Sequence, residues 1–398
     1  MSEQEQIRRL AKEYLADTVA IRRHLHAHPE LSFEEFETSA YIKETLKQWG
    51  IPFKDGFVKT GIVALIEGKN PSKKTVALRA DIDALPIREE NKVPYVSANE
   101  GVMHACGHDV HTSSVLASAR ILLALKDEFE GTVKLIFQPG EEKLPGGASL
   151  MIKEGALENP RPDAMFGQHV QPDIPAGKVG FRPGQYMASA DELFITVKGK
   201  GGHGAMPNLN VDPVLIGAHL IVALQQLVSR QAPPAIPTVL SIGKVIADGA
   251  TNVIPDEVKM EGTFRTMNET WRTEAHQKMV QLGESLAASM GGSCDFRVEK
   301  GYPCLMNHER LTQRAMAWAQ KFLGKDNVIH LPLRMTSEDF SFYSQVADTC
   351  FYRMGTGNVE KGITSQIHTS TFDIDESALE TSSGLMAWLA LQELATED

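Results

Sequence analysis

The sequence has few cysteines, no long apolar run and no cluster of positive charge. Its cysteines are scattered and form no C-x-x-C pair, so we expect no disulfide framework in a chain of this size. They are Cys106, Cys294, Cys304 and Cys350. The first thirty residues are charged throughout and lack the apolar segment of a secretory signal, and no run approaches the roughly 20 apolar residues that cross a bilayer. A cytoplasmic protein without a membrane partner is therefore expected.

Basic residues are too few and too dispersed for nucleic-acid binding. The chain carries 40 Lys and Arg against 51 Asp and Glu, a net charge of -11, and it has no Lys/Arg stripe that would follow a phosphate backbone. Internal repeats and low-complexity stretches are absent as well. A length of 398 residues exceeds a typical single core, so two domains are the first expectation.

Apolar β-rich runs alternate with helical patterns over most of the chain, which is typical of a mostly parallel sheet covered by helices. We expect strands over residues 61–67, 74–79, 133–138 and 349–355, and a further strand that ends at 168–169. We expect helices over residues 4–27, 37–49, 111–125, 148–154 and 309–323. The predicted fold class is α/β, with a doubly wound, mostly parallel sheet.

The pattern changes between residues 187 and 300. Strands are expected at 191–197, 239–245, 257–266 and 294–299, and helices at 212–229 and 269–289. The resulting order, β-α-β-β-α-β, is that of a ferredoxin-like module. We therefore predict an α/β domain made of residues 1–186 and 301–398, with an inserted ferredoxin-like domain of residues 187–300.

The densest chemistry lies in the segment MHACGHDVH at residues 103–111, which holds three histidines, a cysteine and an aspartate. Alone, such a segment is better explained by a polar loop that caps the following helix. Other polar residues change that balance because they end or follow apolar strands: Asp81, Glu141, Glu142, His169 and His368. Ligands bind beyond the carboxyl ends of strands in open α/β sheets, so we expect these residues to share one site.

The donor types favour transition metals. Two neighbouring buried carboxylates repel unless a cation neutralises them, so a metal on Glu142 would leave Glu141 as a proton carrier. The candidate ligands combine thiolate, imidazole and carboxylate: Cys106, His108, Glu142, His169 and His368. This mixture suits Zn²⁺, Mn²⁺, Co²⁺ or Ni²⁺ better than Ca²⁺ or Mg²⁺. Because five ligands exceed one tetrahedral site, we expect two divalent metal ions per subunit.

Recognisable segments occur along nearly the whole chain. They are RHLHAHPEL (23–31), RADIDALPI (79–87), MHACGHDVH (103–111), FQPGEE (137–142), KGKGGHGAMP (198–207), NVIPD (252–256), FRT (264–266), SEDF (337–340) and FDIDE (372–376). In content and order they closely resemble the M20 peptidase family, subfamily D. That branch comprises N-acyl-amino-acid amidohydrolases, hippurate hydrolases and auxin-conjugate hydrolases.

The resemblance assigns roles to individual residues. It implies the five metal ligands proposed above, with Cys106 bridging two ions, and it implies Glu141 as the general base. Asp81 resembles the carboxylate that orients a metal ligand, a partner that such imidazoles commonly require. The resemblance further implies that the insert is a dimerisation and lid domain of a homodimer. The implied substrate is a small N-acyl amino acid.

Residues of the insert and the following segment are candidates for substrate contacts. His203, flanked by glycines, is the candidate donor to the oxyanion, and the resemblance suggests that it reaches the neighbouring subunit's site; without the resemblance, a mobile turn is the better explanation. Arg265 and Asn252 are candidates for a clamp on a substrate carboxylate, with a salt bridge and a turn as the alternatives. Glu338 is either an active-site hydrogen-bond partner or part of a structural ion pair.

Five positions depart from the family's usual pattern. Thr336 and Ser337 stand where Gly-Gly is frequent, Asn208 where His is frequent, and Ser370 where Pro is frequent. Gln168 occupies a position that is usually apolar. None of these changes removes a proposed ligand or the base, so they concern substrate preference.

Three alternatives remain open. A dipeptidase, aminopeptidase, carboxypeptidase or N-acetyl-diaminopimelate deacetylase of the same family would share the metals and base and differ in its pocket. An enzyme with Cys106 as nucleophile would survive chelation. A non-catalytic metal-dependent binding protein would not need Glu141 beside Glu142.

Overall fold

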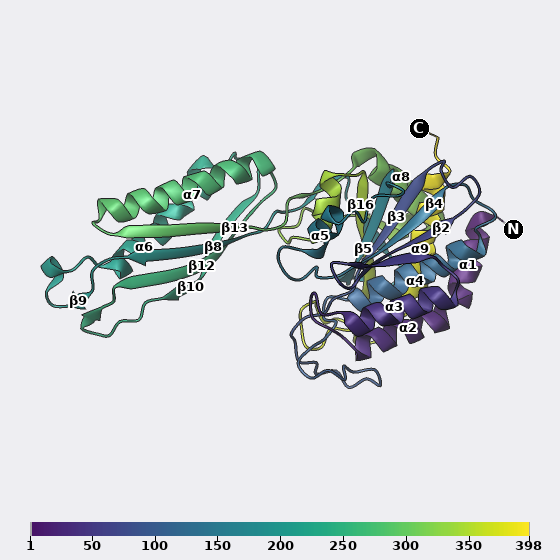
Figure 1. The fold of residues 1–398 in the computed structure, drawn as a ribbon, viewed down its shortest axis with the longest axis horizontal. Helices are drawn as coiled ribbons and strands as arrows, with labels where there is room; N and C mark the ends of the chain where they lie inside the picture. The colour runs from purple at the N-terminus through teal and green to yellow at the C-terminus, as the bar shows by residue number, and fades with distance from the viewer. Residues whose placement is uncertain (1, 398) are drawn as a thin grey trace. The chain divides into compact units, whose positions relative to one another are not determined.

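The chain separates into two units, of which each is described by itself (Figure 1). The computed structural model describes residues 2–397. The first unit combines Met1–Gly184, Met306–Pro332 and Asp339–Asp398, and the second combines Gln185–Leu305 with Leu333–Glu338. The chain thus leaves the first unit and returns to it, with a short second excursion shortly before residue 339.

The first unit is built on an eight-stranded sheet with the order β1-β2-β4-β3-β5-β16-β6-β15. Its four central strands are parallel: β4 (Thr132–Gln138), β3 (Thr75–Asp81), β5 (Ala164–Pro175) and β16 (Thr349–Gly357). All residues of β3, β4 and β16 are buried, as expected of strands covered on both faces. The outer strands are β1 (Phe53–Phe57) and β2 (Gly61–Glu67) on one side, and β6 (Val179–Phe181) and β15 (Val328–His330) on the other.

Helices cover both faces of this sheet, so the predicted doubly wound α/β class is confirmed. Phe166 and Gly167 of β5 point to opposite faces. Phe166 belongs to the apolar core shared with the helices α1 (Glu3–Glu13), α2 (Leu15–Ala27), α3 (Phe36–Gln48), α4 (His108–Ala124), α8 (Glu309–Leu323) and α9 (Ala378–Leu394). A Cβ on Gly167 would lie 2.7 Å from the Phe340 ring, so the 3₁₀ segment η4 (Asp339–Gln345) covers the other face, where it contacts α5 (Gly147–Lys153).

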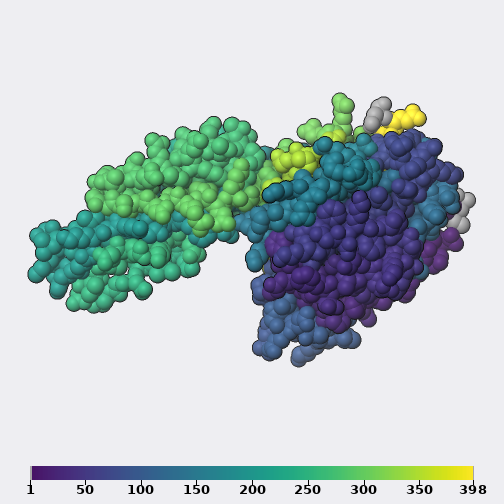
Figure 2. All heavy atoms as spheres, in the orientation of Figure 1, coloured from purple at the N-terminus to yellow at the C-terminus, as the bar shows by residue number. Residues whose placement is uncertain are grey.

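The N-terminal helix predicted over 4–27 is two helices that meet at Tyr14. Each buries a different stripe, because α1 packs mainly on α9 and α2 mainly on α4. Gln392 of α9 also donates a hydrogen bond of 2.9 Å to Glu3, which ties the two ends of the chain together. In Figure 2 the N-terminal residues, coloured purple, accordingly lie within the surface of the first unit.

Strand β5 does not end at His169 as predicted but continues to Pro175. The proline-rich sequence after His169 predicts an end because proline cannot donate to a central ladder. The structure explains the exception: β3 pairs with β5 only as far as Gly167, and beyond it β5 pairs with β16 alone. One edge of β5 therefore needs no N–H donors there. Helix α9, which the sequence reading did not identify, lies in the core of the same unit.

The second unit has the predicted βαββαβ order: β8 (Asp191–Lys198), α6 (Pro213–Gln226), β10 (Thr238–Ile246), β12 (Glu257–Thr266), α7 (Glu269–Ser289) and β13 (Ser293–Lys300). Its sheet has the order β10-β12-β8-β13 and is antiparallel throughout. Leu193, Ile195 and Val197 alternate along β8 and bury one face against α6 and α7. Short elements complete the unit and its borders: β7 (Gly184–Met187), β9 (Gly202–His203), η1 (Pro207–Leu209), β11 (Val253–Ile254) and β14 (Leu305–Asn307). Segment η3 (Lys325–Asn327) belongs to the first unit.

Helix α6 continues through the π-helical turn η2 (Leu227–Gln231), and residues 213–231 are long and apolar enough to cross a membrane by length and composition. We had expected no apolar run of this length from the sequence. The helix nevertheless buries Ile216, Leu220, Leu224 and Leu227 in the core of the second unit. This spacing of three to four residues is that of a helix packed on a sheet through one stripe.

Candidate metal centre

The segment before α4 delivers two candidate ligands, Cys106 and His108, on either side of Gly107. Gly107 has a φ of 79°, and a Cβ at this position would lie 2.7 Å from Val170. Only glycine therefore allows the turn that presents both side chains. Helix α4 begins at His108, three residues earlier than predicted, so its first turn is part of the site.

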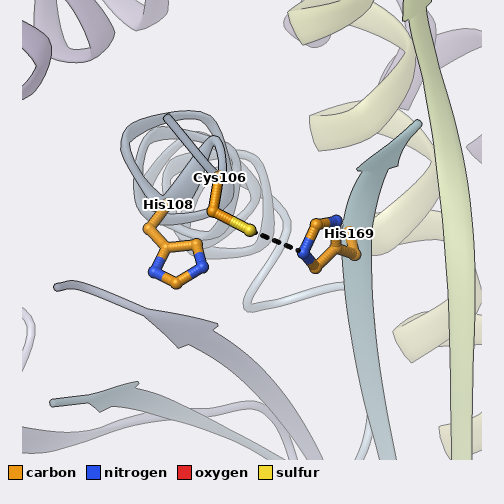
Figure 3. A group of neighbouring side chains, drawn as sticks. All are labelled: Cys106, His108 and His169. Carbon is orange, nitrogen blue, oxygen red and sulfur yellow. Dashed lines mark hydrogen bonds between the residues drawn. The ribbon is translucent and has the colours of Figure 1, made fainter. Parts of the chain in front are cut away.

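The first grouping consists of Cys106, His108 and His169, which converge from the N-terminus of α4 and from β5 (Figure 3). The Cys106 Sγ lies 3.3 Å from the His169 Nε2. Two donor atoms that share a tetrahedral zinc ion are separated by roughly 3.5 Å, because the metal–ligand distances are roughly 2.0–2.3 Å. The spacing therefore fits two ligands of one ion.

A second grouping contains Cys106 again, with Glu142 and His368. The His368 Nε2 lies 3.3 Å from the Cys106 Sγ and 3.3 Å from the Glu142 Oε1. His368 is held in a left-handed conformation (φ 61°), and its N–H donates to the Ala105 carbonyl over 2.8 Å. The five proposed ligands therefore come together in two groupings that share one sulfur atom.

The hydrogen bonds of each imidazole show which nitrogen faces the groupings. His108 Nδ1 bonds to the Asp83 carboxylate over 3.1 Å, and His169 Nδ1 bonds to the Val170 carbonyl over 2.8 Å. In both rings Nδ1 is thus engaged in a hydrogen bond, and Nε2 is the atom that can ligate a metal. His111 differs, because its Nδ1 bonds to Asp81 over 2.6 Å while its Nε2 accepts the Val170 N–H over 2.9 Å. Both His111 nitrogens are occupied, so His111 supports the site without ligating.

The two aspartates after β3 have different partners. Asp81, which the sequence suggested as the orienting carboxylate, bonds to His111 and to Arg79. The carboxylate that bonds to the candidate ligand His108 is Asp83, which also accepts the Glu142 N–H over 3.0 Å. Sequence reasoning passed over Asp83, although its position two residues after Asp81 places both on the same side of an extended segment.

The electrostatics of the site call for cations. Burial and the negative charges of Glu142, Glu141 and Asp81 raise the pKa of Cys106 far above its usual value. Burial lowers the pKa of His169, whereas for His108 the charges of Asp81 and Asp83 outweigh burial and raise the pKa to about 10. His108 Nε2 and Glu142 Oε1 are buried and 3.9 Å apart, and neither has a hydrogen-bond partner among the described residues; their neighbours are the ion-pair contacts to Asp81 at 3.7 Å and to His368 at 3.3 Å. Divalent ions would satisfy these atoms and stabilise the thiolate, so the donor set fits them.

Glu141 lies beside these ligands in the first unit. It is 6% exposed and belongs to a further acidic grouping with His108 and Glu142. Its Oε1 accepts the Asp339 N–H over 3.3 Å. The carboxylate is thus buried next to the proposed ligands, where a base that acts on an activated water has to lie.

The remaining candidates belong to the second unit, where the structure brings some of them together. His203 in β9 pairs with Val253 in β11, and the Gly204 N–H donates to the Asn252 carbonyl over 2.8 Å. The Ala205 N–H donates to His203 Nδ1 over 3.0 Å, so the neutral ring carries its proton on the exposed Nε2. This is the tautomer that donates a hydrogen bond to an oxyanion.

Arg265 and Asn252 do not lie together. Arg265 sits at the C-terminal end of β12 and donates over 3.3 Å to the Met335 carbonyl and the Ser337 hydroxyl, whereas Asn252 precedes the other end of that strand. Eight residues of extended strand span about 27 Å. The two side chains of one chain therefore cannot clamp one carboxylate. Glu338 is 2% exposed and directly precedes Asp339.

Comparison with known proteins places this geometry in context. Residues 77–392 match the family model described as peptidase family M20/M25/M40. The N-acyl-L-amino acid amidohydrolase of Geobacillus stearothermophilus is 43% identical over 77% of this chain and 82% of its own length. The thermostable carboxypeptidase 2 of Saccharolobus solfataricus is 37% identical over 94% of both chains.

A solved structure is similar over nearly the whole chain. The YXEP protein of Bacillus subtilis, described as a dinuclear metal-binding peptidase from the M20 family, shares 36% identity. The similarity covers 97% of this chain and 100% of the other, with a TM-score of 0.84. The fold, the two ligand groupings and the family match therefore agree.

Proposed function

The chain belongs to the peptidase family M20/M25/M40 and is an amide-cleaving hydrolase, and from this premise we propose that it hydrolyses N-acyl amino acids at a two-metal centre. The products are a carboxylic acid and a free amino acid. The centre takes two divalent ions; the mixed sulfur, nitrogen and oxygen donors suit Zn²⁺, Mn²⁺, Co²⁺ or Ni²⁺.

The observation that carries the proposal is the position of Cys106 in two ligand groupings, with Glu141 beside them. A single structural ion would need only one grouping of four ligands. A thiol nucleophile is less consistent with a sulfur whose pKa is raised by burial and by the charges of Glu142, Glu141 and Asp81, because the thiolate is the reactive form. Cys106 is therefore proposed as the ligand that both ions share.

The ions supply an activated water and a polarised carbonyl when bound. Glu141 accepts the proton of the attacking water and transfers it to the leaving amine, which is the expected exchange of a positioned carboxylate. Asp83 holds His108 by its Nδ1 and holds the Glu142 N–H, so two proposed ligands depend on one carboxylate. Asp81 acts one step further away through His111.

His203 is the proposed hydrogen-bond donor to the oxyanion, through its Nε2 proton. The separation of Asn252 from Arg265 supports a composite site. We propose that His203 and Asn252 of one subunit serve the metal centre of the partner subunit, where the partner's own Arg265 binds the substrate carboxylate. The role of Glu338 is proposed to be a hydrogen bond to the substrate.

The second unit also offers a surface for a homodimer. Strand β10 is an edge strand of nine residues, and such a free edge is normally covered or paired. Exposed apolar residues lie on β10 and on α6: Val214, Leu215, Val222, Val239, Val245 and Ile246. We propose that two copies associate through this face, so that the second unit acts as dimerisation domain and as a lid.

The test is hydrolysis of a panel of N-acetyl and N-benzoyl amino acids and of dipeptides by protein reconstituted with each candidate metal. The variant Glu141→Gln preserves shape and removes the base, so kcat should fall by about 10²- to 10⁴-fold while two metals per chain remain bound. Chelation should abolish turnover, and metal addition should restore it.

Each alternative has its own outcome. Preferential cleavage of dipeptides would replace the N-acyl substrate with a peptide, in line with the carboxypeptidase relative. Activity that survives chelation and is lost on Cys106 alkylation would point to a thiol nucleophile. No turnover by protein with two bound metals would leave only a binding function.

A further inference from the structure

We propose that Glu35 is a positioning residue, which holds the general base Glu141 in place through the backbone of Gly140. This inference rests on the proposed function, in which Glu141 is the base. Glu35 and Glu141 are far apart in sequence, and the hydrogen bonds of the Glu35 carboxylate go to Phe33, Thr60 and Gly140 rather than to a proposed metal ligand.

Glu35 is fully buried, and its carboxylate accepts three hydrogen bonds. Oε1 accepts the Gly140 N–H over 2.9 Å and the Phe33 N–H over 2.7 Å, and Oε2 accepts the Thr60 hydroxyl over 2.8 Å. Gly140 immediately precedes Glu141. A buried carboxylate is costly unless it is hydrogen-bonded, and here one of its bonds goes directly to the segment that carries the base.

The ordinary role of an acidic residue at this place would be to cap helix α3. Glu35 is the N-cap residue of α3, yet its side chain makes no capping hydrogen bond. The first turn of α3 is instead bound by Glu30, whose carboxylate accepts the Glu37 and Thr38 N–H groups over 3.1 and 2.8 Å. The Glu35 carboxylate is therefore directed away from its own helix and toward Gly140.

Other contacts show that Gly140 is held on several sides. It has a φ of 62°, and a Cβ at this position would lie 2.3 Å from the Phe33 ring. Its carbonyl accepts the Gly147 N–H over 2.9 Å. Phe33 itself is left-handed, with a φ of 68°, and is bound by Glu35. Glu35 thus organises both the N–H of Gly140 and the ring packed against it.

The neighbouring ligand has a separate anchor, which makes the proposal testable. The Glu142 N–H is bound by Asp83, not by Glu35. Loss of the Glu35 carboxylate should therefore release the backbone ahead of Glu141 while Glu142 stays in place. Burial, with a contribution from the charge of Asp83, raises the pKa of Glu35 to about 7, which agrees with a carboxylate enclosed in this structure.

The experiment compares Glu35 variants in the metal-loaded enzyme. Glu35→Ala removes the Gly140 anchor, so kcat should fall by about 10- to 100-fold, since small displacements of a catalytic group have effects of this size. KM and the two bound metals should be retained. Glu35→Gln should keep kcat within about threefold, because its amide oxygen accepts the two N–H groups and its NH₂ donates to Thr60.

Glu30→Ala is the matched control, because it also removes a carboxylate that binds two backbone N–H groups. It should weaken the start of helix α3 and leave kcat within about twofold. If Glu35→Ala does not fold, Glu35→Asp serves in its place, because it keeps the charge and withdraws the carboxylate from Gly140. It should show the same selective loss in kcat.

A double-mutant cycle with Glu141→Gln decides between positioning and general damage. If Glu35 acts through the base, Glu35→Ala should lower the residual kcat of Glu141→Gln by less than about twofold. An equal loss in both backgrounds, a loss of metal, or a kcat that matches Glu30→Ala would overturn the positioning role alone. A Glu141→Gln enzyme with wild-type kcat would overturn the proposed function itself, and with it this role.

Discussion

At the scale of single residues, the second nitrogen of each histidine decides whether the ring can ligate. His108 and His169 donate from Nδ1 to a carboxylate and a backbone carbonyl and keep Nε2 available. His111 is also buried and is much closer in sequence to Cys106 than His169 is. Its Nε2, however, accepts a hydrogen bond from a backbone N–H. Residue type and burial alone would not separate these three rings.

Asp83 should therefore contribute to metal affinity, although the sequence pattern did not single it out. The variant Asp83→Ala removes the partner of His108 and the anchor of Glu142, so metal affinity should fall by about 10- to 100-fold. Titration of the chelated protein with the metal, followed by calorimetry, measures this change. Asp55→Ala, which removes an exposed carboxylate paired with Lys43, is the control. Equal affinities of the two variants would contradict the assigned role of Asp83.

At the scale of elements, helix α6 has two apolar faces, of which one is buried and the other is exposed. One stripe is buried in the second unit, while Val222 on the other side is 74% exposed. The neighbouring strand β10 is an edge strand whose last residues are also exposed and apolar. A helix that is apolar all round is normally buried on more than one side. In the proposed dimer, a second copy of the chain would cover this face.

The variant Leu215→Lys/Val222→Lys places two charges on this face of α6. Because each apolar side chain loses about 1.5–3 kcal/mol of burial and the twofold axis counts it twice, the dimer dissociation constant should rise by at least about 100-fold. Light scattering coupled to size exclusion measures the mass of the particle. kcat should fall with dissociation, since His203 is proposed to serve the partner's site.

Gln277→Lys on α7 is the matched control, because it adds a charge to the exposed side of the other helix. It should change neither mass nor activity. A monomeric wild-type protein with full activity would contradict both the dimer and the composite site.

At the scale of the whole molecule, all five proposed ligands and the base lie in the first unit. Metal binding should therefore stabilise that unit and leave the second largely unaffected. A ligand at 100 times its dissociation constant stabilises the folded state by about 2.7 kcal/mol. Chelation should accordingly lower the unfolding temperature of the first unit.

Hydrogen exchange with mass spectrometry resolves this prediction by segment. After chelation, amide exchange should accelerate in β3, β4, β5 and the first turn of α4, while β8, β12 and β13 keep their rates. Restored protection on addition of the metal is the control. Equal acceleration in both units would show that they unfold as one body, which would contradict this prediction.

The sequence alone was sufficient for the features that depend on local pattern. Hydrophobic periodicity predicted the alternating strands and helices and the βαββαβ order of the insert, because core-facing residues recur every two or every three to four positions. The placement of Glu141, Glu142 and His368 after strands predicted one shared site, because parallel strands end at one edge of the sheet. The family match confirmed the kind of enzyme.

Only the tertiary structure decided features that depend on a partner distant in the chain. The break at Tyr14 arises because α1 and α2 pack on different helices, and β5 can extend past His169 because its pairing with β3 stops at Gly167. Likewise, Asp83 bonds to His108 and Glu35 to Gly140 across 25 and 105 residues. Local sequence preferences do not predict such contacts, because the same carboxylate residue can either cap its own helix or bind a distant backbone N–H.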